Sequence, residues 1–342
     1  GSRAISSIRL IITKSIAISE TKKVTLNCAM INTKEQIDSW KNVVDFVHKN
    51  SKAKIAIQLG HSGRRGGVKL PWEGYNIPLE NAWNLLSASA IPYKDKMSVP
   101  KEMDWEDMKL VISEFMQATK NAEEAGFDMI EIQANHGFLL ASFLSPLTNS
   151  RTDEFGGSIE NRLKFPLEVF KAVRENFHQD KPISIRISAF DWAENGISEE
   201  DVLQIAKAFK EAGADIINVS TGYTVAKQKP AYGRMYQTPF SDAIKNTVQI
   251  PTITTGTIQD IDQINTIILN KRADLVALGR PLLLDPNFVR NAQAYEQFEA
   301  DDIPKQYEAG ISHLYPYKLS ERKAIETMKK ELKPESHKRI TN

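Results

Sequence analysis

Apolar and polar positions alternate along this chain in two rhythms, one typical of strands and one typical of helices. Seven short runs rich in β-branched residues have the length of buried strands. These runs are Arg9–Ile16, Lys54–Leu59, Asp128–Gln133, Ile183–Ser188, Asp215–Ser220, Ile250–Thr254 and Asp274–Leu278. The amphipathic segments between them predict helices at Lys34–Lys49, Trp105–Ala125, Ser158–Phe177, Ser198–Ala212, Asp242–Thr247, Asp260–Leu269 and Asn287–Gln297. This alternation predicts βα units and a parallel sheet.

The length of 342 residues suits either one large α/β barrel or two ordinary domains. We expect a single domain over residues 1–328. Residues 329–342 are mostly charged or polar and lack an apolar stripe, so they predict a polar, frayed C-terminal tail. The long connection at 61–101 follows a strand and contains several aromatic residues, prolines and glycines. It is expected either to build part of a binding site or to fold on itself as a surface lobe.

Composition narrows the class of partner. The 44 Lys and Arg residues nearly balance the 43 Asp and Glu residues, so no basic surface is expected to bind nucleic acid. Cys28 is the single cysteine, which excludes an intrachain disulfide and a cysteine-only metal or iron–sulfur site. The apolar run from Ile8 to Ile18 is interrupted by Arg9 and Lys14 and is too short to cross a membrane. We therefore expect a cytoplasmic protein with a small-molecule partner and no metal.

A continuous motif from Glu131 to Arg162 carries the strongest functional signal. It contains the sequence Gln-Ala-Asn-His-Gly-Phe at residues 133–138, at the end of a predicted strand, where an α/β barrel keeps its catalytic residues. The motif closely resembles the central signature of the Old Yellow Enzyme family of flavin oxidoreductases. The resemblance covers nearly the whole chain. It implies an α/β fold of the TIM (β/α)8 barrel type that binds FMN and takes hydride from NAD(P)H.

The seven predicted strands are one fewer than such a barrel needs. The segment from Gly1 to Ala4 is similar to the helix that follows the first strand in the family, so we expect the chain to lack that strand. Seven strands leave two unpaired edges where the ring should close. The expectation is that the natural reading frame extends upstream of Gly1, or else that the fold is compromised.

Three positions are expected to contact the flavin ring. Gln58 ends a strand, and its amide can both donate to and accept from the edge of a pyrimidinedione. Arg186 is a permanent cation among apolar residues of a central strand, which is costly unless an anion lies near. Reduced flavin would supply that charge, and a salt bridge inside the barrel is the alternative. Ser15 lies where the resemblance places a small residue against the flavin.

Two glycine-containing loops are expected to hold the FMN phosphate. Gly256 and Thr257 follow one of the last two strands, and Gly279 and Arg280 follow the other. TIM barrels commonly bind phosphate at these positions, where glycine lets the backbone approach and arginine grips two oxygens. The chain has no glycine-rich dinucleotide fingerprint and no P-loop. The nicotinamide donor is therefore expected to use the acceptor site above the flavin.

Gln133 and His136 occupy the spacing at which the family has two residues that hydrogen-bond the acceptor oxygen. The glutamine amide can donate to that oxygen but cannot carry the positive charge of a histidine. A core histidine is the ordinary interpretation of His136 taken alone. Phe138 stands where the resemblance implies a tyrosine that protonates the substrate carbon, and general acid help is worth about 10²- to 10⁴-fold in rate.

These observations favour an FMN-dependent oxidoreductase that reduces an unsaturated or aromatic carbonyl or acyl-CoA acceptor with NAD(P)H. The alternative is a catalytically impaired barrel that binds a flavin or a CoA ligand and scaffolds a partner flavin monooxygenase. The motif from Pro71 to Gly74 and that from Ser188 to Trp192 resemble the Old Yellow Enzyme-like half of bifunctional salicylyl-CoA and anthraniloyl-CoA hydroxylases. That resemblance implies fusion to an FAD monooxygenase domain in the full-length protein. A homo-oligomer is the alternative arrangement.

Overall fold

The computed structural model describes residues 1–296 and 304–331, and the chain divides into two compact units. Unit 1 contains residues 1–11, 46–53 and the chain from Gly279 onward. Unit 2 contains residues 12–45 and 54–278. The single domain over residues 1–328 stays a prediction. Of the expected tail, residues 329–331 end a helix, and 332–342 lie outside the described residues.

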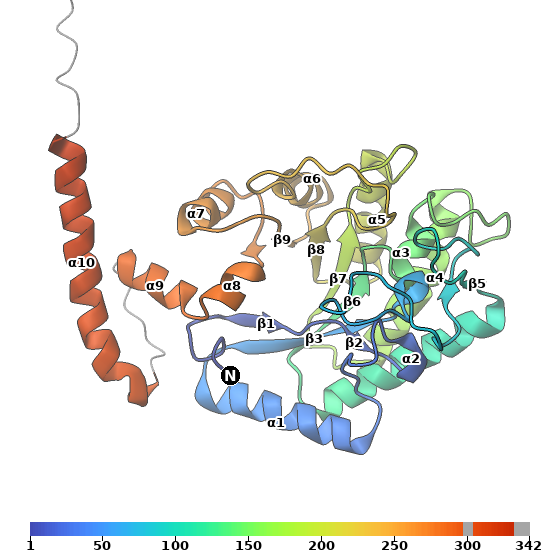
Figure 1. Cartoon of the computed structure of the whole chain (residues 1–342), viewed down its shortest axis with the longest axis horizontal. Coiled ribbons are helices and arrows are strands. Elements are labelled where there is room, and N and C mark those ends of the chain that lie inside the picture. The colour runs from blue at the N-terminus through green and yellow to red at the C-terminus, as the bar shows by residue number, and fades with distance from the viewer. Residues whose placement is uncertain (297–303, 332–342) are drawn as a thin grey trace, which may run out of the picture. The chain divides into compact units, whose positions relative to one another are not determined.

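A parallel sheet forms the centre of unit 2 (Figure 1). The strand order is β1-β3-β6-β7-β8-β9-β10, and β2 also pairs with β3. The bounds are β1 (Leu10–Ile12), β2 (Ile16–Ala17), β3 (Lys54–Gly60), β6 (Met129–Ala134), β7 (Ile183–Ser188), β8 (Ile216–Ser220), β9 (Thr252–Thr254) and β10 (Leu275–Val276). Seven parallel strands in this order form an open half-barrel, which confirms the α/β fold and the expected barrel architecture with one strand missing.

The central strands are buried along their whole length. All six residues of β6 are buried, and in β7 only Arg186 is partly exposed. Strands covered on both faces have near-continuous apolar runs, which is why the sequence pattern located them well. The predicted strand Arg9–Ile16 is wrong as one element, because it forms β1 and β2 with a break at residues 13–15. At that break the Thr13 N–H donates to the Ala56 carbonyl at 3.0 Å.

Helices follow the strands and pack beside one another in chain order, α2 on α4, α4 on α5 and α5 on α6. The α-helices that begin in unit 2 are α1 (Lys34–Asn50), α2 (Trp105–Glu124), α3 (Leu139–Leu144), α4 (Ile159–Asn176), α5 (Glu199–Glu211), α6 (Thr238–Val248) and α7 (Ile261–Leu269). A 3-10 turn, η1, spans Glu20–Lys22. The Ser198 side chain accepts from the Asp201 N–H at 3.0 Å, and the Asp201 carboxylate accepts from the Ser198 N–H. This reciprocal cap fixes the start of α5 where the sequence predicts it.

Two helices of unit 2 depart from the predicted pattern for identifiable reasons. Helix α6 begins at Thr238 rather than at Asp242, because Pro239 occupies its first turn, where a proline is tolerated. Helix α3 was not predicted. All six of its residues are buried, so it has no polar face and no amphipathic period.

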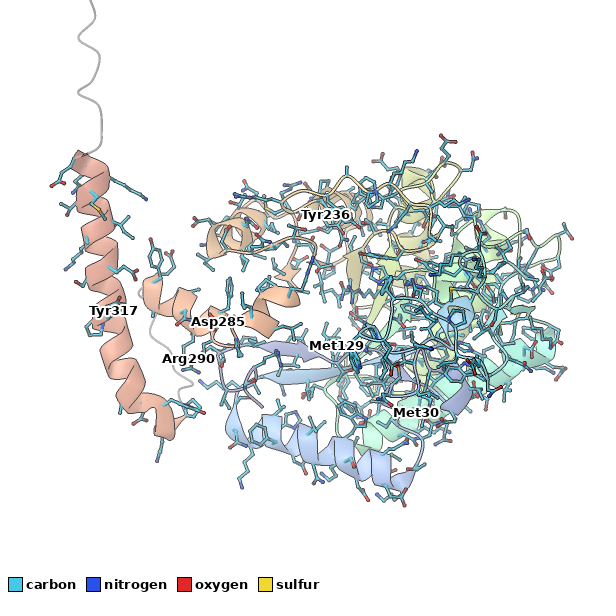
Figure 2. The ribbon with its side chains drawn as sticks, viewed as in Figure 1. Met30, Met129, Tyr236, Asp285, Arg290 and Tyr317 are labelled. Carbon is cyan, nitrogen blue, oxygen red and sulfur yellow. The ribbon has the colours of Figure 1, made fainter. Side chains whose placement is uncertain are left out.

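Unit 1 contains the helices α8 (Arg280–Leu284), α9 (Phe288–Tyr295) and α10 (Glu308–Glu331), with a 3-10 turn η3 at Lys305–Tyr307. Within this unit the Arg290 guanidinium donates to the Ile5 carbonyl, and the Asp285 carboxylate accepts from the Asn291 amide at 3.0 Å (Figure 2). Helix α9 confirms the predicted helix at Asn287–Gln297 as far as Tyr295, and Gln297 lies outside the described residues.

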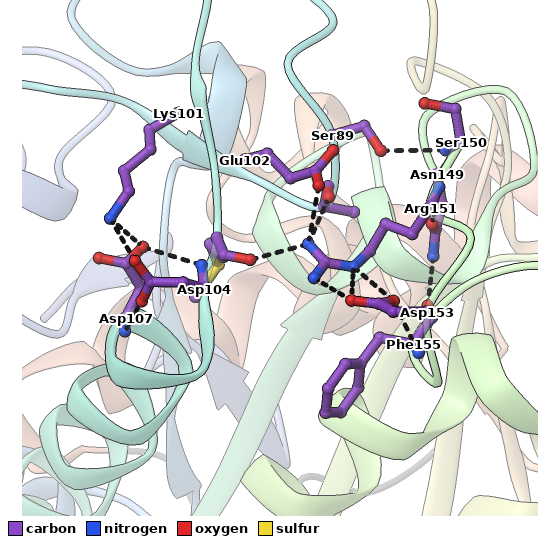
Figure 3. A network of polar contacts seen from close by, with 12 residues as sticks. Ser89, Lys101, Glu102, Asp104, Asp107, Asn149, Ser150, Arg151, Asp153 and Phe155 are labelled. Carbon is purple, nitrogen blue, oxygen red and sulfur yellow. Dashed lines mark hydrogen bonds and ion pairs between the residues drawn. The ribbon is translucent and has the colours of Figure 1, made fainter.

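The long connection after β3 contains the 3-10 turn η2 (Gly63–Arg65) and strand β4 (Leu86–Ser87), which pairs with β5 (Lys101–Glu102). Arg151 fastens this connection, because its guanidinium donates to the carbonyls of Ala88 at 3.0 Å and Met103 at 2.8 Å and pairs with Asp153 (Figure 3). The Ser89 hydroxyl accepts from the Ser150 N–H at 3.0 Å. The second half of the signature motif therefore has a structural role.

No helix in the described part of the chain is apolar over a length that could cross a lipid bilayer.

Candidate active site

Polar side chains from neighbouring strands meet inside the sheet of unit 2. The Ser15 hydroxyl donates to the Gln133 Oε1 at 2.8 Å, and the Gln133 Nε2 donates to the Gln58 Oε1 at 3.3 Å. The Gln58 Nε2 in turn donates to the Glu131 carboxylate at 2.6 Å. The structure thus brings three predicted site residues into one hydrogen-bonded chain, and the fourth member is one that the sequence analysis did not single out.

Glu131 anchors this chain from a fully buried position. Besides Gln58 it accepts hydrogen bonds from the Asn218 amide at 2.7 Å and the Ser184 hydroxyl at 3.3 Å. A buried carboxylate needs such donors because burial removes it from water. The signal in the sequence was an acidic residue in the middle of an apolar strand.

The network leaves Gln58 with capacity for a ligand. An amide has two N–H donors and two lone pairs on its oxygen. One N–H is used by Glu131 and one lone pair by Gln133, so one of each remains. These two hydrogen bonds therefore fix the orientation of the Gln58 amide, and one N–H and one oxygen lone pair remain for a ligand.

Gly60, at the end of β3, makes room for the polar chain. A Cβ at this position would overlap the Ser15 hydroxyl and the Gln133 Oε1, closer than real Cβ atoms approach any atom. Only glycine lets these two side chains meet beside the backbone.

Arg186 has no ion pair in the described chain. In residues 1–296 and 304–331 no carboxylate pairs with it, and its Nε is buried without a hydrogen-bond partner. The salt bridge that was the alternative explanation of this residue is therefore absent from these residues. A cation on a central strand with an unsatisfied donor is suited to an anionic ligand.

His136 lies on the loop after β6 in a left-handed backbone conformation, with a φ of 55°. Its N–H donates to the Ser188 hydroxyl at 2.8 Å, and its ring meets the Tyr223 ring edge-on at a centroid distance of 5.1 Å. Burial, and then the charges of Arg186 and Arg65, hold the pKa of His136 well below its usual range. The imidazole is therefore neutral and can act as a hydrogen-bond donor but not as a cation.

The loop after β3 docks on the loop that holds His136. The Leu139 N–H donates to the His61 carbonyl at 3.1 Å, and a Cβ at Gly63 would lie 2.7 Å from the Leu139 nitrogen. Burial, followed by the charge of Lys22, also lowers the pKa of His61 well below its usual range. Phe138 precedes α3 on this docked loop and is partly exposed.

Only part of the predicted phosphate site lies in unit 2. Gly256 and Thr257 follow β9 with φ angles of 103° and 53°. A Cβ at Gly256 would come within 2.9 Å of the side chains of Gln237 and Tyr236, so this glycine is required both for its φ and for close packing. Gly279 and Arg280 belong to unit 1, where Gly279 precedes α8.

Comparison with known proteins identifies the family. Residues 1–298 match the model of the NADH:flavin oxidoreductase / NADH oxidase family. The chain is 39% identical over 306 residues to an NADPH dehydrogenase of Listeria welshimeri, covering 90% of this chain and 85% of that protein. It is 37% identical over 311 residues to an NADPH dehydrogenase of Clostridium acetobutylicum, covering 91% and 87%.

Two solved structures have a similar fold. Morphinone reductase in complex with tetrahydroNAD, an N189A mutant, superposes with a TM-score of 0.69 at 26% identity, covering 85% of this chain and 79% of that one. A 2-naphthoyl-CoA reductase in complex with 2-naphthoyl-CoA superposes with a TM-score of 0.75 at 23% identity. That match covers 85% of this chain but 45% of the reductase, and at this identity it shows the fold alone.

The chain therefore belongs to the NADH:flavin oxidoreductase / NADH oxidase family, the Old Yellow Enzyme family, and is an oxidoreductase of that family. Membership implies a flavin and NAD(P)H. The Listeria and Clostridium relatives are named NADPH dehydrogenases, rather than halves of bifunctional hydroxylases.

Proposed function

We propose that this protein is an FMN-dependent reductase that oxidises NADPH and reduces an unsaturated or aromatic carbonyl acceptor, including acyl-CoA thioesters. The observation that carries the proposal is Arg186 of β7, which has no acidic partner among the described residues, together with the neutral His136 after β6, in a chain that belongs to a flavin oxidoreductase family. The names of the two bacterial relatives support NADPH as the donor.

The residues present suit an FMN. The free Nε of Arg186 matches the anionic edge of a reduced flavin, and the remaining amide capacity of Gln58 matches its pyrimidine edge. Ser15 would lie against the ring. The phosphate would be held by the four loop residues Gly256, Thr257, Gly279 and Arg280. FMN, when bound, supplies hydride transfer from the nicotinamide to the acceptor.

Gln133 and His136 would orient the acceptor by donating hydrogen bonds to its oxygen. Gln133 has one N–H left after its bond to Gln58, and the neutral imidazole of His136 has one N–H. Two neutral donors stabilise developing negative charge on oxygen without themselves transferring a proton.

A second candidate function is a catalytically impaired module that binds a flavin or a CoA ligand and scaffolds a partner monooxygenase. Phe138 favours it, because phenylalanine cannot protonate the acceptor carbon.

Anaerobic titration of the FMN-loaded protein tests the proposal. The flavin absorbance near the visible maximum should bleach on addition of NADPH, more readily than with NADH, and return on addition of an enone or an aromatic acyl-CoA. A protein that binds FMN but is bleached by neither nucleotide would support the scaffold function. A protein that cannot be loaded with FMN would contradict both the FMN-dependent reductase and the flavin-binding scaffold.

A further inference from the structure

Two adjacent arginines in the η2 turn are buried, and neither has an acidic partner among the described residues. Arg64 is 1% exposed and Arg65 is 8% exposed. No carboxylate in residues 1–296 or 304–331 forms an ion pair with either side chain, and the Nε of each is buried without a hydrogen bond. Charges are rarely buried unless they are paired, so this arrangement needs an explanation.

Arg64 is explained by the loops that it joins. Its guanidinium donates to the carbonyls of Ile91 and Pro92, at 3.1 Å each, and to the carbonyl of Thr224 at 2.6 Å. These bonds fasten the long connection after β3 to the loop after β8. Burial lowers the pKa of Arg64 to about 10, which leaves it charged at neutral pH. Its role is structural.

Arg65 has a different environment. Its main anchor is one bond, from Nη1 to the His136 carbonyl at 2.6 Å, with a longer contact of 3.5 Å to the Tyr223 carbonyl. The guanidinium carbon lies 4.4 Å from the centre of the Tyr93 ring and 5.1 Å from that of the Phe138 ring. A planar cation beside two aromatic rings retains donors at its edge while its faces are covered.

The position of Arg65 connects it to the acceptor. It is bonded to the backbone of His136, a proposed acceptor-orienting residue, and it touches Phe138, at the place of the family's proton donor. A group bound near these two residues would therefore lie within reach of a buried, permanently positive side chain.

We propose that Arg65 is a specificity-determining residue that binds a carboxylate group on the acceptor. This inference rests on the proposed reductase function, whose acceptor site it defines further. A carboxylate is the anion that matches the planar fork of a guanidinium with two parallel hydrogen bonds. The flanking rings of Tyr93 and Phe138 suit a flat conjugated skeleton such as an unsaturated or aryl carboxylic acid.

An isosteric ligand pair tests this assignment on the FMN-loaded protein. Cinnamate and cinnamamide differ in charge but hardly in shape, and calorimetry gives both dissociation constants without relying on flavin absorbance. The wild-type protein should bind cinnamate at least about tenfold more tightly than cinnamamide, as expected for a charge-assisted bond. In Arg65→Gln this preference should fall to near one, with little change in the affinity for cinnamamide.

Two further variants separate recognition from folding. Arg65→Lys keeps the charge but loses the two-pronged geometry, so it should retain part of the preference. Arg272→Gln removes a cation that pairs with Asp242 outside the site and should leave the preference unchanged. If Arg65 only positions the loop, Arg65→Gln will weaken both ligands equally, and the proposal fails.

If Arg65→Gln folds poorly, the ratio of the two dissociation constants in the wild-type protein still tests the proposal. A preference near one in the wild-type protein overturns the inference. Bleaching by NADPH, measured on the same samples, keeps the two proposals apart. Normal bleaching with no preference for cinnamate contradicts the role of Arg65 only, whereas a clear preference without bleaching contradicts the reductase function only.

Discussion

Two cations, Arg65 and Arg186, act on the imidazole of His136. Each lowers its pKa beyond the effect of burial, so the site stays positively charged through its arginines while its histidine is neutral. The proposed acceptor site therefore combines permanent positive charge with neutral donors. Phe138 adds no proton donor to this set.

Replacement of Phe138 by tyrosine tests whether a proton donor is what the site lacks. If it is, Phe138→Tyr should speed the oxidation of reduced enzyme by an enone by a factor of about ten or more, since a well-placed general acid contributes about 10²- to 10⁴-fold. Stopped-flow reoxidation with cyclohexenone measures this rate. Reduction by NADPH serves as the internal control and should not change. Equal reoxidation rates would show that proton transfer does not limit this step.

The two neutral histidines predict a dependence of stability on pH. His61 and His136 have pKa values below the ordinary 6.5 in the folded chain, so below pH 6.5 the unfolded chain binds protons that the folded chain does not. The free energy of unfolding should therefore decrease as the pH falls below 6.5, by up to about 1.4 kcal/mol per pH unit for each histidine.

Urea unfolding between pH 7 and 5 measures this slope. His61→Gln and His136→Asn should each flatten it, because each removes one titrating group. His178→Gln is the matched control, since His178 is exposed, and it should leave the slope unchanged. A slope that is the same in all variants would mean that other groups control the acid sensitivity.

At the scale of elements, the hydrogen bonds of Glu131 tie four neighbouring strands together. Glu131 lies on β6 and binds Gln58 of β3, Ser184 of β7 and Asn218 of β8. The same network fixes Gln133 and Ser15 through Gln58. The positions of the proposed flavin contacts therefore depend on the register of the sheet.

Gly60→Ala tests the importance of this packing. The added methyl group would displace the Ser15 hydroxyl and the Gln133 amide oxygen, so we expect these two groups to lose their hydrogen bond, at a cost of about 1 kcal/mol in the free energy of unfolding. It should also weaken FMN binding if Ser15 contacts the flavin.

Gly233→Ala is the matched control, because nothing lies within 4 Å of the new Cβ and the glycine is not in the left-handed region. Chemical denaturation and FMN titration of both variants give the two quantities. A Gly60→Ala protein with wild-type stability and FMN affinity would show that the polar chain can rearrange without cost.

At the scale of the whole molecule, the chain divides into two compact units, and each contains a loop with residues that the sequence predicts to contact phosphate. Gly256 and Thr257 are in unit 2, whereas Gly279 and Arg280 are in unit 1.

Arg280→Ala tests the phosphate assignment of the loop in unit 1. Loss of a charge-assisted phosphate contact should reduce the free energy of FMN binding by about 2 kcal/mol, roughly thirtyfold in the dissociation constant. Quenching of FMN fluorescence measures the affinity. Lys323→Ala, on the exposed surface of α10, should bind FMN as the wild-type chain does. Unchanged affinity in Arg280→Ala would remove this residue from the phosphate site.

The amino-acid sequence by itself determined the order of strands and helices and the family, because parallel strands buried on both faces have continuous apolar runs and the signature after β6 is long. It also singled out Gln58, Gln133 and Arg186 as polar residues within predicted strands. Local sequence is sufficient to predict strands, helices and motifs, since each of these depends on residues that are neighbours along the chain.

Only the tertiary structure decided which of these polar groups are satisfied. The chain from Ser15 to Glu131, the absence of an acidic partner for Arg186 within the described residues and the bond from Arg65 to His136 all join segments far apart in sequence. Charge state and free hydrogen-bonding capacity depend on burial and on such distant contacts, which no local pattern specifies. For that reason the sequence predicts which residues form the site, while the structure showed that His136 is neutral and that, among the described residues, Arg65 and Arg186 have no acidic partner.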